Sequence, residues 1–250
     1  MRFLRILLTA FCFTTFGLGG LFIGSFIFPL ILIFGDGRKQ RFIFSYIIHI
    51  SWKLFVYLMS ACRLISVKMV NSEHLKSLKG KIVVANHPSL IDIVILISQI
   101  PNSICIVKGA LANNFFIKNI IKCVYILNNE DFEALSNKVD EALKENFNII
   151  IFPEGTRTNF NNKEYKFHRG FAQLAIKSNA NIIPINIESS PHILGKNQKW
   201  YDIGVSVVKY IVTVHNEITI CKNDKISNHT QSKELVNCVK AKIFNAFSNN

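Results

Sequence analysis

The most constraining feature of this sequence is a long uncharged run near its start. From Ile6 to Phe34 there is no charged side chain. Such a run is long enough to cross a bilayer, which needs about 20 consecutive apolar residues. The apolar core of a signal peptide is shorter, about 7–15 residues, so we expect a retained membrane anchor. Half of the residues of the chain are hydrophobic, which agrees with a membrane-attached segment.

A second apolar stretch runs from Phe42 to Cys62 and is interrupted by His49 and Lys53. Trp52 and Tyr57 are residue types that favour the membrane–water interface. The stretch fits a second span or a helix lying among the headgroups. Because basic residues flank both ends of the first run, a helical hairpin that dips into one leaflet also fits. We expect the cytoplasmic membrane, with the rest of the chain on the cytoplasmic side. The flanking residues are Arg2, Arg5, Arg38, Lys39 and Arg41.

The net charge limits the partners that the chain can bind. Lys and Arg number 29 against 16 Asp and Glu, a formal net charge of +13. This charge favours nucleic acid, anionic lipid or a phosphorylated substrate. We recognise no nucleic-acid motif, and the basic residues adjoin an apolar anchor, so anionic lipid is the preferred partner. The six cysteines form no CxxC pair, which favours reduced thiols and gives no zinc site.

Beyond Arg63 the sequence alternates short β-rich runs with amphipathic stretches, a pattern typical of an α/β domain. We therefore divide the chain into an N-terminal membrane-associated helical segment, residues 1–62, and one domain, residues 63–250. Strands are predicted near residues 65–70, 81–85, 103–107, 124–127, 148–152, 181–187 and 205–214. Helices are predicted near residues 90–98, 111–123, 131–145, 170–178 and 232–247.

The stretch VVANHPSLID, residues 83–92, places a histidine and an aspartate where a strand gives way to a helix. Within a straight helix, residues five positions apart are turned by about 140° and could not meet. Pro88 suits the first position of a helix, where its missing N–H needs no partner. His87 would then lie just outside the helix and fold back toward Asp92, a carboxylate favoured near a helix start. An imidazole held in this way has a fixed tautomer and a second nitrogen that can act as a general base.

A second hydrophobic strand, IIIFPEGTRT in residues 149–158, also ends in a charged turn that contains glycine. Glu154 and Arg157 should emerge at the carboxyl end of this strand, where open α/β sheets place their ligands. The planar fork of arginine matches a phosphate group. The following stretch KFHRG adds basic side chains, and we expect a basic pocket here. These side chains are Lys166, His168 and Arg169.

The two motifs together resemble those of the phospholipid/glycerol acyltransferase family, typified by 1-acylglycerol-3-phosphate acyltransferases. NHPSLID is similar to the family's first motif, a histidine and an aspartate separated by four residues, and FPEGTRT is similar to its third. NIIPINI, residues 181–187, resembles the fourth motif, with Pro184 as the key residue. Lys108 and the turn at residues 114–116 fall in the region of the second motif. The resemblance covers roughly residues 65–215. It implies an α/β acyltransferase-like domain with a mixed central sheet flanked by helices, preceded by the hydrophobic anchoring helices.

The resemblance also implies a mechanism of direct acyl transfer. His87 would take the proton of an acceptor hydroxyl, whose oxygen attacks an acyl thioester, while Asp92 orients His87 and stabilises its imidazolium. Acyl-CoA or acyl carrier protein would be the co-substrate, and we expect no other cofactor and no metal. Arg157, with Lys108 or Lys166, would hold the acceptor phosphate. The full set of expected substrate-binding residues is Glu154, Gly155, Thr156, Arg157, Lys108, Lys166 and Pro184.

Three alternatives remain open at this point. The leading acceptor is 1-acylglycerol 3-phosphate, which would give phosphatidic acid. The same chemistry could use glycerol 3-phosphate, another lysolipid or a specialised lipid. A chain of this charge could instead be a non-catalytic protein that binds anionic lipid.

The segment GKNQKWY, residues 195–201, fits either an interfacial patch or a solvated loop.

Overall fold

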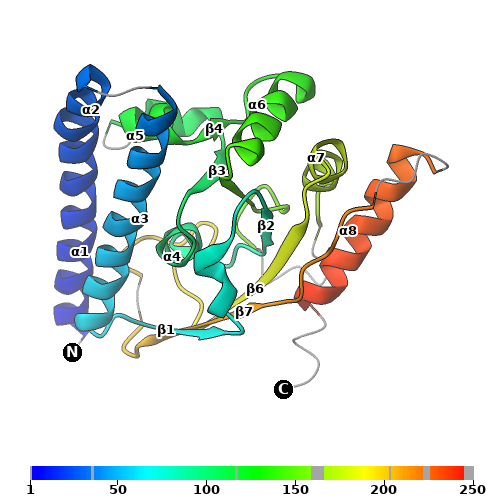
Figure 1. Cartoon of the computed structure of the whole chain (residues 1–250). Coiled ribbons are helices and arrows are strands. Elements are labelled where there is room, and N and C mark those ends of the chain that lie inside the picture. The colour runs from blue at the N-terminus through cyan, green and yellow to red at the C-terminus, as the bar shows by residue number, and fades with distance from the viewer. Residues whose placement is uncertain are drawn as a thin grey trace.

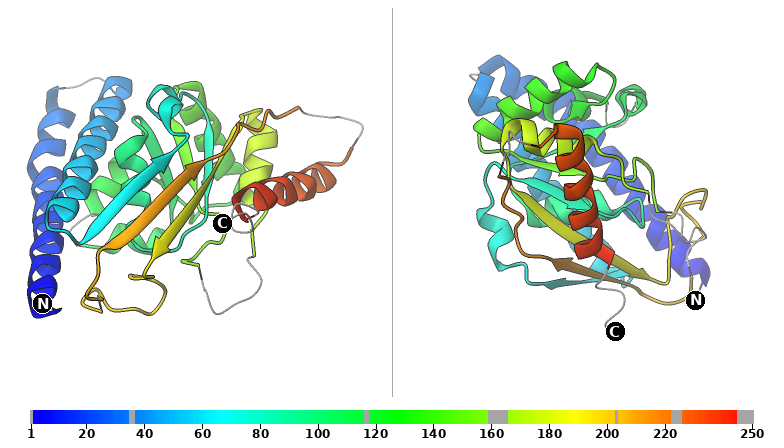
Figure 2. Two further views of the ribbon diagram at one scale, coloured as in Figure 1. Left: turned by 90° about the horizontal axis from the view of Figure 1, so that it is seen from below. Right: turned by 90° about the vertical axis from the view of Figure 1, so that its right-hand side faces the viewer.

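The computed structural model describes residues 2–34, 37–115, 118–158, 166–202, 204–221 and 226–244. Within these residues a seven-stranded sheet lies between two layers of helices (Figure 1). The N-terminal helices form the outer wall on one side, and the C-terminal helix lies on the opposite side. The left view of Figure 2 shows the same separation of the N-terminal helices from the C-terminal helix.

The sheet is mixed, with a parallel body and one antiparallel pairing. Its strand order is β1-β7-β6-β2-β5-β3-β4, and in the described part of the chain only β6 and β7 pair antiparallel. This sheet, flanked by helices, confirms the predicted fold class. The strands are β1 (Ile65–Val70), β2 (Ile82–Ala85), β3 (Ser103–Val107), β4 (Ile126–Leu127), β5 (Asn148–Ile151), β6 (Ile182–Ser190) and β7 (Val208–Val214).

The helices divide between the two faces of the sheet. Two of them, α3 and α4, pack together on one face, and α6, α7 and α8 cover the other. The helices are α1 (Arg2–Phe22), α2 (Phe28–Phe34), α3 (Gly37–Ala61), α4 (Asp92–Gln99), α5 (Lys118–Val124), α6 (Phe132–Lys144), α7 (Gly170–Ser178) and α8 (Asn228–Phe244). A π-helical turn, Ile23–Ile27, joins α1 to α2, and 3₁₀ turns occupy Glu73–Ser77 and Gly109–Asn113.

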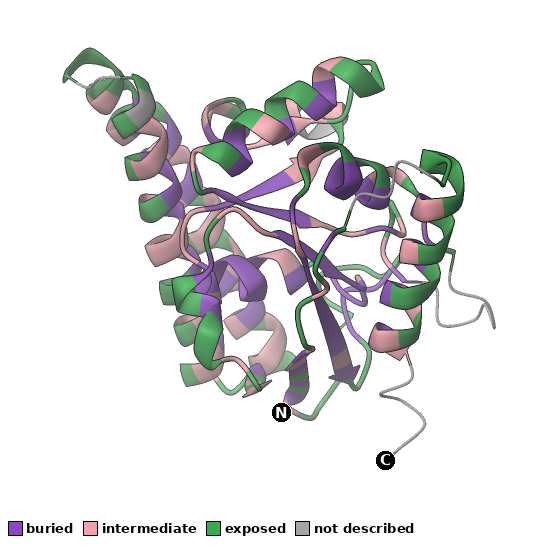
Figure 3. Ribbon diagram, turned by 45° about the vertical axis from the view of Figure 1, so that its right-hand side comes forward, coloured by how far each residue is buried: buried purple, intermediate pink, exposed green. Residues whose placement is uncertain are grey.

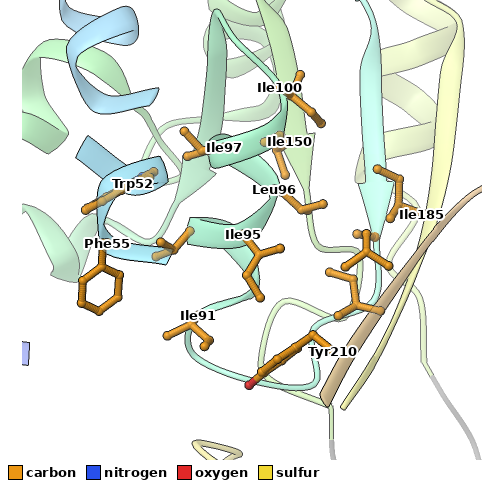
Figure 4. Packing of buried hydrophobic residues seen from close by; sticks show 14 of the residues in the cluster. Trp52, Phe55, Ile91, Ile95, Leu96, Ile97, Ile100, Ile150, Ile185 and Tyr210 are labelled. Atoms are coloured by element: carbon orange, nitrogen blue, oxygen red, sulfur yellow. The ribbon is translucent and has the colours of Figure 1, made fainter. Parts of the chain in front are cut away.

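The central strand β2 is buried on both faces, as its sequence IVVA predicts for a parallel strand between helix layers. Val83 and Ala85 point into the core beneath α3 and α4, whereas Ile82 and Val84 point into the core beneath α6, α7 and α8. Figure 3 shows the buried strands between helices whose outer faces are exposed. Figure 4 shows the apolar side chains of α4 packed between α3 and the sheet. The carboxyl end of β2 is therefore held rigidly from both sides.

α3 contacts the α/β domain along its length rather than projecting away from it. Near its start, Arg41 meets Glu145 at 3.5 Å, and the ring of Phe42 stacks on that of Phe147. Further along, the Nδ1 atom of His49 lies 2.6 Å from the carbonyl oxygen of Ile97. The start and the middle of α3 are thus tied to the domain, and the predicted division between residues 62 and 63 falls just after this helix.

The outer face of the N-terminal helices is apolar and exposed. Two helical segments, Arg2–Phe34 and Lys39–Ala61, are long and apolar enough to cross a membrane by length and composition. The exposed residues run from one end of the first segment to the other: Phe3, Leu4, Leu7, Phe11, Leu18, Phe22, Phe26, Leu30, Leu32, Ile33 and Phe34. Apolar faces of this extent are typical of sites that interact with another protein or with a membrane.

Most predicted elements agree with the structure to within a few residues, and two regions differ. The helix expected from Leu90 begins at Asp92, so Pro88 precedes the helix by four residues and does not occupy its first turn. The helix expected over residues 111–123 is divided into the 3₁₀ turn Gly109–Asn113 and α5. Phe116, assigned to the second motif, lies outside the described residues.

Candidate active site

The two motifs meet because β2 and β5 are neighbouring parallel strands. The chain leaves β2 toward α4 on one face of the sheet, and it leaves β5 toward α7 on the other. Adjacent strands whose connections diverge in this way form a crevice at their carboxyl ends, which is where open α/β sheets bind ligands. His87 and Glu154 lie just beyond these two strand ends.

His87 and Asp92 form a hydrogen-bonded pair at this edge. The Nδ1 atom of His87 lies 2.9 Å from Oδ2 of Asp92. The side chain of Asp92 is fully buried, whereas 18% of the His87 side chain is exposed. The imidazole ring also stacks on Phe152, with ring centroids 4.1 Å apart. With Nδ1 turned toward the carboxylate and one face covered, Nε2 is the nitrogen left to accept a proton.

The pair forms through a turn and not through the helix start that Pro88 suggests. Ser89 donates its backbone N–H to Oδ2 of Asp92 and its hydroxyl to Oδ1, both at 2.6 Å. These bonds close a tight turn that ends at the first residue of α4. Asp92 thereby serves both as the partner of His87 and as the acceptor for the backbone that leads into the helix. Burial raises the pKa of the Asp92 carboxyl, although the hydrogen bonds from His87 and Ser89 act in the opposite direction.

Glu154 holds the two motifs together. Its Oε1 atom accepts the backbone N–H of His87 at 2.9 Å and the hydroxyl of Thr158 at 2.8 Å. Thr158 in turn donates its N–H to the carbonyl of His87 at 2.7 Å. The backbone of the histidine is thus fixed on both of its polar groups. Burial raises the pKa of Glu154, opposed by these hydrogen bonds. The structure therefore gives this carboxylate partners within the protein, beside any contact with substrate.

Arg157 lies between the third motif and a distant loop. Its Nη1 atom donates to the carbonyls of Leu194 and Gly195, each at 2.8 Å. The carbonyl of Leu194 also accepts the N–H of Leu90, just after the first motif. Among the residues that the structure describes, Nε and Nη2 of Arg157 contact no acceptor. One edge of the guanidinium is therefore anchored, and the other makes no hydrogen bond to a described residue.

The remaining predicted substrate-binding residues differ in their positions. Gly155 has a φ of +64°, which a residue with a side chain rarely adopts. Thr156 beside it is exposed. Lys108 follows β3 at the same edge of the sheet, and Lys166 lies near the turn; both are exposed. Within the described residues neither lysine contacts His87 or Arg157. Pro184 is buried within β6, opposite Val84 of β2.

Several residues of the site escaped the sequence reasoning. Asn86, inside the first motif, makes two hydrogen bonds to the backbone of Ile187 on β6, at 2.7 and 2.8 Å. Tyr210 of β7 donates its hydroxyl to Ser89 at 3.1 Å. Ser89 and Asn86 could have been found as polar residues inside the motif. No signal marks Tyr210, because its contact depends on the order of strands in the sheet.

The fold and the site define an α/β protein that carries a buried carboxylate and a partly exposed histidine at the carboxyl edge of a mainly parallel sheet. Arg157, beyond the neighbouring strand end, bonds the same Leu194 carbonyl that accepts the N–H of Leu90. Residues 66–188 match the model of the Acyltransferase family, and the chain carries a domain of that family. The resemblance expected from the NHPSLID and FPEGTRT motifs is thereby confirmed.

Known proteins support this assignment at modest identity. The chain is 32% identical over 133 residues to the 1-acyl-sn-glycerol-3-phosphate acyltransferase of Helicobacter pylori, covering 50% of this chain and 56% of that protein. It is 24% identical over 160 residues to the human 1-acyl-sn-glycerol-3-phosphate acyltransferase alpha, covering 61% and 56% respectively. The chain thus spans about half the length of the curated relatives it matches.

The fold is shared with a solved structure over nearly the whole chain. The crystal structure of the 1-acyl-sn-glycerophosphate (LPA) acyltransferase from Thermotoga maritima superimposes with a TM-score of 0.70 at 22% identity. The match covers 96% of this chain and 97% of that one, so it includes the N-terminal helices as well as the sheet.

Proposed function

We propose that this chain is a membrane-associated acyltransferase that moves a fatty acyl group from a thioester to the free hydroxyl of 1-acylglycerol 3-phosphate, forming phosphatidic acid. The observation that carries the proposal is the contact between Nδ1 of His87 and the buried carboxylate of Asp92. This pair lies at the carboxyl edge of the sheet. The names of the curated relatives support this choice of acceptor.

The chemistry follows from the two nitrogens of the imidazole. Nδ1 faces Asp92, so Nε2 of His87 takes the proton of the acceptor hydroxyl as its oxygen attacks the thioester carbonyl. The imidazolium formed in this step is stabilised by the carboxylate at 2.9 Å. Collapse of the tetrahedral intermediate releases the thiolate, which recovers the proton from His87. The acyl group passes directly from donor to acceptor, so no nucleophilic side chain is needed.

The acceptor's phosphate suits the open edge of Arg157. The guanidinium is fixed by two carbonyls and offers the remaining N–H groups, whose geometry matches two oxygens of a phosphate. A lysine that bonded the same two carbonyls would have one N–H left and could not present such a pair of donors. Lys108 and Lys166 add positive charge at the same edge of the sheet. Their electrostatic attraction for an anion acts over several ångströms, so it does not require direct contact.

We place the N-terminal helices in the plane of one leaflet. α3 contacts the α/β domain at its start and at its middle, so a perpendicular span would draw part of this domain into the hydrocarbon. The segment Arg2–Phe34 is exposed and apolar over its whole length of about 50 Å, longer than the roughly 30 Å thickness of the hydrocarbon core. The basic residues at both ends of this segment support the cytoplasmic face.

The proposal is tested by acyl transfer with the purified, detergent-solubilised protein. Wild type is supplied with lysophosphatidic acid and either long-chain acyl-CoA or acyl carrier protein, beside His87→Ala and the control His74→Ala. His74 is an exposed histidine on the turn between β1 and β2. We expect His87→Ala to lower the rate by about 10²- to 10⁴-fold and His74→Ala to leave it unchanged.

Two results would contradict different parts of the proposal. Full activity in a folded His87→Ala variant would exclude the general-base mechanism. A wild-type rate that is higher with glycerol 3-phosphate or another lysolipid than with lysophosphatidic acid would replace the acceptor. The family's chemistry would stand in that second case. Activity with neither donor on any acceptor would favour the non-catalytic lipid-binding alternative.

A further inference from the structure

We infer that residues 195–206, which connect β6 to β7, form an interfacial loop that docks onto an anionic bilayer surface beside the start of α1. The inference concerns a surface distinct from the apolar face of the helices, and it rests on the membrane association proposed above. The described residues of this interfacial loop are 195–202 and 204–206.

The loop exposes large apolar and aromatic side chains. Trp200 is 44% exposed, Tyr201 is 41% exposed and Val205 is 70% exposed. The rings of Trp200 and Tyr201 meet edge to face, with centroids 5.4 Å apart. Trp and Tyr have amphipathic rings, with an apolar body and a polar N–H or O–H group. Membrane proteins concentrate these residues at the level of the lipid headgroups. Two exposed aromatic rings beside an exposed valine thus fit a bilayer interface better than bulk water.

The loop is fastened to the first turn of α1. The guanidinium of Arg5 donates to the carbonyl of Gly204 at 3.1 Å and to that of Ser206 at 2.7 Å. It also reaches the carbonyl of Arg63, after α3, at 2.9 Å. In Figure 2 the loop between β6 and β7 lies close to the N-terminal end of α1. The loop and the helix therefore move as one surface.

The first turn of α1 also exposes apolar side chains. Phe3 and Leu4, in the first turn of α1, are 73% and 60% exposed. A membrane that receives these side chains also lies within reach of Trp200 and Tyr201, because Arg5 joins the two segments. Exposed apolar side chains are thus present on both segments that Arg5 joins.

Charge selects an anionic bilayer as the partner. Lys196 and Lys199 are exposed on the loop, and Lys199 lies 5.4 Å over the ring of Tyr201. Arg2 adds a third positive charge and meets the single acidic residue of the loop, Asp202, at 3.9 Å. Clusters of basic residues beside apolar anchors are attracted to anionic headgroups.

The loop also connects the membrane to the proposed active site. Its first residue, Gly195, and its neighbour Leu194 accept the hydrogen bonds of Arg157. The other end of the loop is held by Arg5. Docking of residues 195–206 would therefore set the height of the anion-binding arginine above the bilayer, where a lysolipid carries its phosphate.

The chain offers a direct reporter, because it contains two tryptophans and only Trp200 of the two is exposed. In a Trp52→Phe variant, all tryptophan emission comes from the loop. Full-length protein is reconstituted in phosphatidylcholine vesicles with and without phosphatidylglycerol, and flotation establishes binding. We expect a blue shift of Trp200 emission, protection from acrylamide, and loss of most of the emission with lipids brominated near the headgroup. Each effect should be larger with phosphatidylglycerol.

Trp52 is buried and stacks on Phe16, so a second route guards against a folding defect. The difference between wild type and Trp200→Phe gives the same spectrum of Trp200 in an otherwise native core. The charge is tested by Lys196→Gln/Lys199→Gln, which should reduce the quenching by brominated lipid. The matched control, Lys177→Gln/Lys233→Gln, removes two exposed lysines from α7 and α8 and should not.

The outcomes separate this inference from the proposed function. Protein that floats with vesicles while Trp200 stays fully open to acrylamide and unquenched by lipid overturns the loop inference and leaves the helical anchor intact. Equal quenching in both lipid mixtures overturns the role of the anionic lipid. Protein that does not float at all overturns both the loop inference and the proposed membrane association. The proposed acyl transfer, which is measured in detergent, would not be affected by this result.

Discussion

The hydroxyl of Tyr210 donates a hydrogen bond to the hydroxyl of Ser89 across 3.1 Å, although the two residues are 121 positions apart. Ser89 donates its own proton to Asp92 at 2.6 Å, and Asp92 faces His87. A line of hydrogen bonds therefore runs from the buried strand β7 to the imidazole. Burial raises the pKa of Tyr210, with the charge of Asp92 acting in the same direction, so the phenol stays a donor.

This line of hydrogen bonds predicts that Tyr210 positions the catalytic pair. Tyr210→Phe keeps the ring in the core and removes a hydrogen bond of about 1 kcal/mol, so we expect kcat to fall roughly fivefold with KM unchanged. Asp92 loses support for its charged form, which should move the acid limb of the kcat profile to higher pH. Steady-state kinetics across pH measures both effects. An unchanged pH profile with a lower thermal midpoint would leave Tyr210 a packing role only.

Asp92→Asn tests the carboxylate itself. Asparagine has nearly the same size and its carbonyl can still accept from Ser89, but it carries no charge to stabilise the imidazolium and can hold His87 in the wrong tautomer. We expect kcat to fall by about 10²- to 10⁴-fold with little change in either KM. The measurement is single-turnover acyl transfer. Ser89→Ala, which removes one hydrogen bond to the carboxylate and keeps the charge, should cost far less; an equal loss in both would contradict this assignment.

Arg157→Lys separates phosphate binding from charge. Lysine keeps the positive charge, but it cannot bond the carbonyls of Leu194 and Gly195 while presenting two further donors to phosphate. We expect KM for the acceptor to rise about 10- to 100-fold, corresponding to the loss of charge-assisted hydrogen bonds. KM for the acyl donor should stay within the error of measurement. A change confined to the donor would assign Arg157 to the other substrate.

Glu154→Gln predicts a pH-dependent gain in stability. The pKa of Glu154 is raised above its ordinary 4.5 by burial, so its protonated form stabilises the folded state below that pH. This contribution is lost as pH rises through the raised pKa. Glutamine keeps an acceptor for His87 N–H and Thr158 without a charge. Its thermal midpoint relative to wild type should therefore climb with pH.

The control for this experiment is Glu141→Gln, which neutralises an exposed carboxylate on α6. Asp92 also has a raised pKa, and its charge is one cause of the raised pKa of Glu154, so the comparison includes the interaction of the two carboxylates. Thermal scans in detergent between about pH 4 and pH 8 give the difference in midpoint between Glu154→Gln and wild type. A difference that stays constant or narrows as pH rises would contradict a raised pKa for Glu154.

The local parts of the site could be predicted from the sequence, and the non-local parts could not. His87 and Asp92 are five residues apart, so one turn brings them together whatever the sheet does. Glu154 was expected from its motif, but its hydrogen bond to His87 depends on β2 pairing with β5. That pairing joins residues 67 positions apart and leaves no periodic trace in the chain.

The fold shows the same division. The alternation of apolar runs predicted the α/β class and most strand positions, because each follows from burial within one element. The start of α4 was placed too early, since Pro88 is a favourable first helical residue and the competing turn depends on the side chain of Asp92. Tyr210 could not be recognised, because only the strand order places β7 near the first motif.

The clamp of Arg5 on Gly204 and Ser206 has a consequence for how the chain is made. These contacts join residues 199 and 201 positions apart. At a synthesis rate of about 5–20 residues per second, roughly 10–40 s pass between the making of the arginine and of its acceptors. During that interval α1 has no folded domain to pack against, and its apolar side chains have no cover from the rest of the chain. With the membrane association proposed above, α1 would bind the lipid surface before the domain folds against it.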